Sequence, residues 1–244
     1  MRVAFRIILI VILVGIVAGI IVMATSLDGI VKRGVETFGP QITKVSVSLE
    51  SVHVVLFTGS ATVKGLVVGN PAGCKSPQAI SVGLAEVGVN PFSILSDKIV
   101  IRTIHVVSPE ITFEGGLGGN NLGKILENVN DFGKTGGKPS TSVAASQPGK
   151  KIEVDDFFIT GAKIHVHLTD LGGKEMTLPL PDIHLTDLGI NDEGLTPAEL
   201  TKAILKAVTS ATVKAVSPSV NNFGMGATED VDKVKKGLGG LFGK

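Results

Sequence analysis

The chain has 244 residues, enough for one large or two small domains, and its formal net charge is only +1. This balance provides no global field that would attract nucleic acid or a strongly acidic partner. Ten Phe with no Trp and no Tyr disfavour base stacking, and the single cysteine, Cys74, excludes an intramolecular disulfide. The core must therefore come from Val, Ile and Leu, which favours β structure.

The first segment of the chain is strongly apolar. From Ile7 to Ala24 every residue is apolar or Gly, and Arg2 and Arg6 precede this run. As a helix the run would be about 27 Å long, close to the hydrocarbon thickness of a bilayer. The positive-inside tendency would keep the N-terminus in the cytoplasm. Residues 1–25 are therefore predicted to form a transmembrane anchor.

Two alternatives for this segment stay open. Val22-Met23-Ala24 has the small residues that suit cleavage of a signal peptide, although the apolar run is longer than the usual h-region. Gly15 and Gly19 form a G-x-x-x-G pair, which would let two such helices approach closely. The second pattern predicts self-association through the anchor.

The next segments change from helical to β periodicity. Residues 26–40 have apolar residues at helical spacing and are predicted to be a helical connector, which Pro40 would end. From residue 41 the period is two, since Val45, Val47 and Leu49 alternate with polar residues. This alternation predicts a strand with one apolar face.

Further strand patterns follow, and one of them changes phase. Ile80 and Val82 alternate in one phase, whereas Ala85 and Val87 alternate in the other. Such a shift indicates a β-bulge or a change of sheet face. A short helix is expected to begin at Asn121.

The remaining chain divides into four parts by composition. Residues 41–132 form the first β-rich half, and residues 133–150 have the Gly, Ser, Thr and Pro content of a flexible linker. Strand patterns resume over residues 151–190, and residues 191–244 contain helices and a basic tail, beginning with a capping box at 196–199. The predicted fold class is α+β: an N-terminal transmembrane helix, then a mainly antiparallel sheet, curved or a sandwich, with C-terminal amphipathic helices.

Spaced motifs occur between Val63 and Leu122. They are a strand ending in Asn-Pro-x-Gly, the run L-x-x-I-x-I-x-x-I, the element P-x-I-x-x-E and an Asn-Leu pair that opens a helix. The residues concerned are Asn70, Pro71, Ala72, Gly73, Leu95, Ile99, Ile101, Ile104, Pro109, Ile111, Glu114, Asn121 and Leu122. In this combination the chain resembles the AsmA-like family of Gram-negative envelope proteins. The chain departs from the family pattern at one point, because Leu95 lies one residue farther from Ile99 than in the run L-x-x-I-x-I-x-x-I.

The resemblance implies a location and a role. It implies a single-pass inner-membrane protein with most of the chain in the periplasm, acting in envelope lipid homeostasis, outer-membrane biogenesis or lipid transport. The partner would be membrane lipid, with acyl chains shielded by the concave face of a curved sheet. The residues expected to line that face are Val45, Val47, Leu49, Ile80, Val82, Ile99, Ile101 and Ile104. For each of them an ordinary core position beneath the C-terminal helix is the alternative.

No motif in the chain supports catalysis. There is no G-x-S-x-G elbow, no P-loop and no H-E-x-x-H. His165 and His167 share one face of a predicted strand, as zinc ligands would, but Lys163 shares that face and favours a solvent-facing side. No catalytic residue, cofactor or metal site is therefore predicted.

Other functions remain as alternatives to lipid binding. The first is a structural or scaffold subunit, whose sheet edges would pair within a homo-oligomer or a larger envelope complex. A sandwich like that of the late-embryogenesis-abundant, water-stress family is the second, because Asn-Pro after a strand also occurs there. An enzyme, of which a hydrolase is the most plausible kind, is the last.

Overall fold

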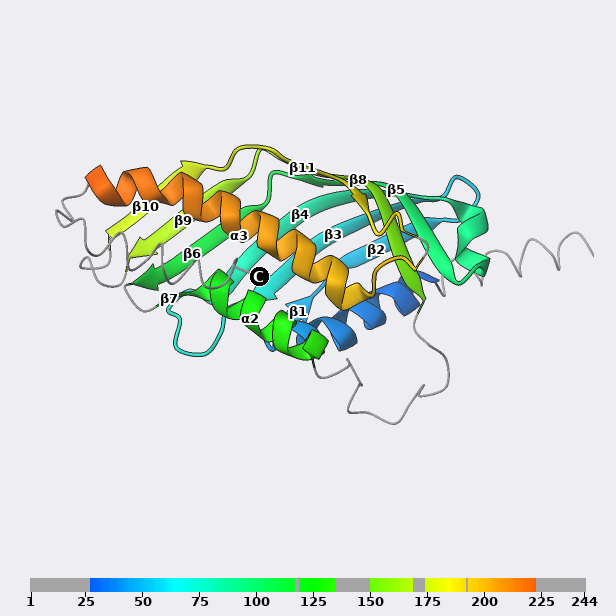
Figure 1. Cartoon of the computed structure of the whole chain (residues 1–244), viewed down its shortest axis with the longest axis horizontal. Helices are drawn as coiled ribbons and strands as arrows, with labels where there is room; N and C mark the ends of the chain where they lie inside the picture. Colours follow the sequence, from blue (N-terminus) through cyan, green and yellow to red (C-terminus); the bar gives the residue numbers. More distant parts are fainter. Residues whose placement is uncertain (1–26, 117–118, 135–149, 169–173, 192, 223–244) are drawn as a thin grey trace, which may run out of the picture.

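The computed structural model describes residues 27–116, 119–134, 150–168, 174–191 and 193–222. Residues 27–43 form a helix, and the strands and helices that follow are named as in Figure 1. These are β1 (Val47–Ser48), β2 (Ser51–Val55), β3 (Ser60–Gly69), β4 (Gln78–Val89), the short 3₁₀ helix η1 (Pro91–Leu95), β5 (Lys98–Val107), β6 (Glu110–Gly116), β7 (Gly119–Asn120), α2 (Asn121–Lys134), β8 (Lys151–Thr160), β9 (Lys163–Leu168), β10 (Lys174–Pro179), β11 (Ile183–Leu188) and α3 (Pro197–Asn222).

All the described strands belong to one curled sheet. Its main order is β10-β9-β6-β4-β5-β8-β11. Outside this order, β3 pairs with β4, β1 and β2 pair with β3, and β7 pairs with β6. The pairs β5–β8 and β6–β9 are parallel, whereas the other strand pairs are antiparallel. Figure 1 shows the sheet curving behind α2 and α3, so that these helices lie across its concave face.

The register places apolar residues on the concave face in rows across the sheet. Ile111 of β6 pairs with Ile164 of β9, which pairs with Leu178 of β10. Ile111 and Ile164 are fully buried and belong to the core, together with Leu122 and Ile125 of α2. The core therefore lies between the concave face and the helices, as expected for an amphipathic sheet that buries one face.

The predicted change of phase in β4 agrees with the burial pattern of that strand. Val82 and Ala85 are both buried, although they would point to opposite faces of a regular strand. On the neighbouring strand, Gly65 has a φ of 60°, and a Cβ atom there would lie 2.6 Å from Cβ of Glu50. A residue with a side chain would be strained at this point, where β3 passes the break between β1 and β2.

The predicted fold is wrong in its architecture. The sheet contains two parallel strand pairs and curls into half a barrel, and the described helices are few and include no transmembrane span. Between β5 and β8 the chain passes through β6, β7 and α2, and such a long crossover is what a parallel pair requires. The alternation of short strands with turn signals indicated hairpins and did not reveal these crossovers.

The predicted membrane span must also be corrected. Within the described ranges, no helix is both long enough and apolar enough to cross a membrane. The long helix α3 carries lysines along its length, which interrupt its apolar residues. The predicted single-pass inner-membrane location conflicts with this finding and is not retained. The residues that predicted the anchor, Ile7, Gly15, Gly19 and Ala24, lie outside the described residues.

The helical segments extend farther than the prolines predicted. Helix 27–43 continues through Pro40, and α3 contains Pro218 and runs to Asn222. Because each proline lies in the last turns of its helix, the missing N–H affects few backbone hydrogen bonds. The second C-terminal helix, the basic tail and most of the predicted linker fall outside the described part of the chain. The bounds of the six predicted segments stay predictions.

Candidate functional site

The expected lipid-contacting residues occupy the core side of the sheet to different degrees. Val45, Leu49 and Val82 are buried, and Ile80, Ile101 and Ile104 are partly buried and pack against the core. The other two, Val47 and Ile99, are also partly buried. Of this set, Val45 belongs to the core cluster that includes residues of α2 and α3, and Ile80, Ile101 and Ile104 pack against it. A closed apolar core and a ligand-shielding face would use these same side chains. Their role as lipid contacts stays a prediction.

The helix α3 covers this face with one stripe of side chains. Leu205, Val208, Thr209, Thr212 and Val216 are buried, at the spacing of one helical face. The hydroxyl oxygens of the two threonines have no hydrogen-bond partner among the described residues. Buried polar groups in folded proteins are nearly always satisfied, so two unpaired hydroxyls in one apolar stripe require an explanation.

A polar network lies at one end of the sheet and joins residues from the motif set. The Asn121 side chain donates from Nδ2 to Oδ1 of Asn70 and to the carbonyl of Thr112, both at 2.7 Å. Its Oδ1 accepts from the backbone N–H of Glu114 at 3.0 Å. Asn70 in turn donates to the carbonyl of Ser76 at 2.8 Å. Residues of the Asn-Pro turn, the P-x-I-x-x-E element and the Asn-Leu pair thus meet in space.

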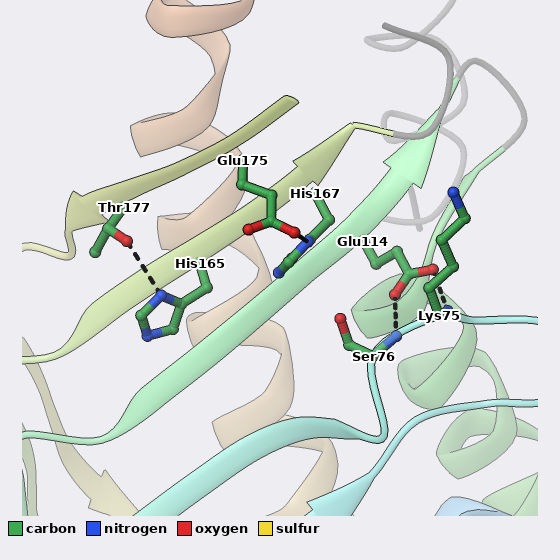
Figure 2. Close-up of polar contacts among 7 residues, drawn as sticks. All are labelled: Lys75, Ser76, Glu114, His165, His167, Glu175 and Thr177. Carbon is green, nitrogen blue, oxygen red and sulfur yellow. Dashed lines mark hydrogen bonds and ion pairs between the residues drawn. The ribbon is translucent and has the colours of Figure 1, made fainter. Parts of the chain in front are cut away.

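Glu114 completes this network by holding the loop between β3 and β4. Its carboxylate accepts from the backbone N–H groups of Lys75 at 2.5 Å and Ser76 at 2.9 Å (Figure 2). Although burial opposes the charged form, the hydrogen bonds from Ser76 and Lys75 and the nearby His167 lower the pKa of Glu114 overall. The motif residues therefore fix the position of the loop between β3 and β4.

The histidines of β9 lie on the opposite face of the sheet from the core. His165 Nδ1 lies 3.1 Å from Thr177 Oγ1, and His167 Nδ1 lies 3.2 Å from a Glu175 carboxylate oxygen (Figure 2). Within the described ranges, no group of three or more His, Cys, Asp or Glu residues could hold a metal ion. The two side chains therefore act as members of cross-strand pairs on the outer face.

Cys74 is not activated as a nucleophile. It is a free, partly buried cysteine in the loop held by Glu114. Burial, followed by the nearby Glu114 charge, raises the pKa of its thiol. A catalytic cysteine requires the opposite shift, because the thiolate is the reactive form.

Sequence reasoning did not single out the most unusual side chains of the structure. Thr209 and Thr212 were unremarked, although two threonines three residues apart in a Leu and Val stripe were a visible signal. Phe57 and Phe92 are strongly exposed, and Leu95, from the motif set, is 92% exposed. The neighbouring Gly59 and Asn90-Pro91 turn signals could have placed these apolar residues on loops.

Comparisons with protein-family models, with curated proteins and with solved structures gave no match. The local geometry is therefore the basis for a functional proposal. The described chain combines a curled apolar face, one long covering helix and two unpaired hydroxyls on that helix. This arrangement is suited to binding an apolar molecule that carries a polar group.

Proposed function

We propose that this protein binds lipid without catalysing a reaction, in the lipid homeostasis, outer-membrane biogenesis or lipid transport that the AsmA-like resemblance implies. The observation that carries the proposal is the apolar concave face of the half-barrel, across which α2 and α3 lie. The shared positions of the motif residues add to it, because Asn70, Glu114 and Asn121 lie in one network.

The lipid acyl chain lies between α3 and the sheet in the proposed complex. Each methylene removed from water there contributes about 0.8 kcal/mol, so an acyl chain can offset the contacts that α3 loses when it moves aside. Because α3 approaches the sheet with one face only, it can shift without breaking a strand pairing. The Thr209 and Thr212 hydroxyls then face the ligand and can donate to its polar group.

Lipid retention and lipid exchange test this function. Mass spectrometry of gently purified protein should detect bound lipid, and the protein should exchange labelled lipid with vesicles. A matched pair of variants locates the site: Ile101→Thr places a hydroxyl on the core side of β5, whereas Val100→Thr places one on the other face. The first variant should retain less lipid than wild type, and the second should retain as much.

Two results would count against lipid binding. One is wild-type protein that carries no lipid and exchanges none. The other is equal lipid retention by the Ile101→Thr and Val100→Thr variants, since binding would then not use the concave face.

A scaffold subunit is the second candidate function, and an open sheet edge favours it. β10 ends the strand order and, among the described strands, pairs with β9 alone. Such an edge can add a strand from another chain or from a second copy. Cross-linking followed by native electrophoresis should then show a larger particle, and a strictly monomeric protein would argue against this candidate.

A further inference from the structure

Three large apolar side chains protrude at one end of the sheet. Phe57, in the turn between β2 and β3, is 81% exposed, and Phe92 and Leu95 of η1 are 88% and 92% exposed. Phe57, Phe92 and Leu95 are called the apolar tip below. Scattered apolar residues on a surface are normal, but three nearly fully exposed ones on adjoining loops indicate a binding surface.

The two loops that carry the apolar tip are fixed side by side. The carbonyl of Gly59 accepts from the N–H of Val89 at 2.5 Å, and the Arg102 guanidinium donates to the Val89 carbonyl at 3.2 Å. Gly59 has a φ of 65°, and a Cβ atom there would lie 2.1 Å from the Val89 oxygen. The loops therefore approach so closely that only glycine fits between them, and the apolar tip is a rigid feature.

The first described helix, 27–43, begins at this same end. The Asp28 carboxylate, in the first turn of helix 27–43, accepts from the N–H of Val54 at 2.8 Å. Val54 lies three residues before Phe57. The residues that precede this helix include the unbroken apolar run from Ile7 to Ala24. In the sequence, the apolar run therefore precedes the helix end that is bonded to β2 beside the apolar tip.

We propose that the apolar tip inserts into the surface of a phospholipid bilayer. Phenylalanine and leucine side chains that project from two loop ends gain most from entering a fluid acyl-chain layer. This inference goes beyond lipid binding under α3, because it concerns a different surface and does not need a bound ligand. It would place one end of the half-barrel at the layer from which a lipid is taken.

Charge at the apolar tip agrees with a phospholipid partner. The Arg102 guanidinium reaches the carbonyls of Thr58 and Val89, and the Lys150 ammonium reaches the carbonyl of Ile94. Two cations therefore lie against the backbone of the loops that carry the protruding side chains. When the apolar side chains enter the acyl-chain layer, these two cations can contact the phosphate groups at the bilayer surface.

The absence of tryptophan from the natural chain makes a direct test available. Phe57→Trp and Phe92→Trp variants of the full chain each carry one Trp at the apolar tip. A Phe38→Trp variant is the matched control, because Phe38 is exposed but lies in helix 27–43, roughly 16 Å along the helix from its first residue. Phospholipid vesicles with and without brominated acyl chains serve as the probe.

With vesicles, both tip variants should show blue-shifted Trp emission and lose intensity to the brominated chains, whereas the control should change little. Emission that stays at the wavelength of water-exposed Trp overturns the proposal, whether or not the protein is on the vesicles. Equal quenching of the control overturns it too, because the apolar tip would not be the inserted part. If the Trp emission shifts to the blue without vesicles, and the shift grows with protein concentration, the apolar tip binds a second copy of the protein and the proposal is wrong.

Discussion

At the scale of single residues, the buried polar groups distinguish fixed parts of the protein from adaptable ones. Glu114 and Asn121 are buried and hydrogen-bonded, Glu114 to backbone N–H groups of the loop between β3 and β4 and Asn121 to Asn70 at the start of that loop, so they hold the loop in one position. Thr209 and Thr212 are equally buried, but their hydroxyls lack partners in the described structure. Glu114 and Asn121 therefore stabilise the fold, whereas the unpaired hydroxyls of Thr209 and Thr212 destabilise it.

Replacing Glu114 with Gln should destabilise the protein at pH 7 by about 1–3 kcal/mol, because hydrogen bonds to a charged acceptor are lost. The folded-state pKa of Glu114 is lowered, so its contribution is present above the unfolded pKa and is lost as pH falls through the folded one. Urea unfolding should therefore show the difference at pH 7 and little difference well below pH ~4.

Glu110→Gln is the control for this variant, since Glu110 is on the same strand but exposed. It should change stability by no more than about 0.5 kcal/mol. If Glu114→Gln has an equally small effect at pH 7, the carboxylate does not hold the loop.

Replacing Thr209 or Thr212 with Val should stabilise the lipid-free protein by about 1 kcal/mol each, because a buried hydroxyl without a partner is removed at nearly constant volume. Urea unfolding of delipidated protein measures this. Thr201→Val is the control, since the Thr201 hydroxyl donates to the carbonyl of Pro197 at 2.7 Å in the same helix. A loss of stability in the first two variants would mean that their hydroxyls are satisfied in solution.

At the scale of elements, α3 is defined most sharply at its N-terminus. The Thr196 hydroxyl accepts from the N–H of Glu199 at 3.2 Å, and the Glu199 carboxylate accepts from the N–H of Thr196 at 2.8 Å. The predicted capping box is therefore confirmed. The hydrogen bonds from the Thr196 backbone and side chain lower the pKa of Glu199, so this cap is weakened as pH falls through that lowered value.

Thr196→Ala should reduce the free energy of unfolding by about 0.5–2 kcal/mol, because the side-chain acceptor for the first turn of α3 is lost. Thr196→Ser keeps a hydroxyl at this position and should restore most of the stability. Urea unfolding of both variants at pH 7 measures the effect. Equal losses in the Ala and Ser variants would show that the hydroxyl does not cap the helix.

At the scale of the whole molecule, the sheet and α3 are held by different kinds of contact. The central strands are hydrogen-bonded to neighbours on both sides, whereas α3 packs through one side-chain stripe and is connected to β11 by residues 189–196. Regions with fewer tertiary contacts open at lower free energy than the global unfolding. The half-barrel can therefore persist while its covering helix moves.

Native-state hydrogen exchange should show amides of α3 opening at a lower free energy than amides of β4 and β6. Low urea concentrations should leave the exchange of the α3 amides nearly unchanged if the helix opens locally, and should accelerate exchange in the central strands only near global unfolding. One common opening free energy and urea dependence for helix and sheet would contradict a separately mobile α3. Lipid would then have to enter by another route.

The sequence by itself determined the features that depend on neighbours along the chain. The helix that begins at Asn121 and the capping box at Thr196 both follow from local periodicity or local hydrogen bonding. The alternation of Val45, Val47 and Leu49 predicted a longer strand than β1, which covers only Val47–Ser48. Of the apolar residues expected on one side of the sheet, Val45 lies in the core cluster and Ile80, Ile101 and Ile104 pack against it. Each of these signals spans only a few residues.

Only the tertiary structure decided which distant segments meet. The parallel pairing of β5 with β8, the network of Asn70, Glu114 and Asn121, and the adjoining loops of the apolar tip all join residues far apart in the chain. Strand periodicity specifies a face but not a partner or a direction, so crossovers and the curl of the sheet were not predictable from it. Exposure of Phe57 and Leu95 was decided in the same way, because an apolar residue is buried only where another element covers it.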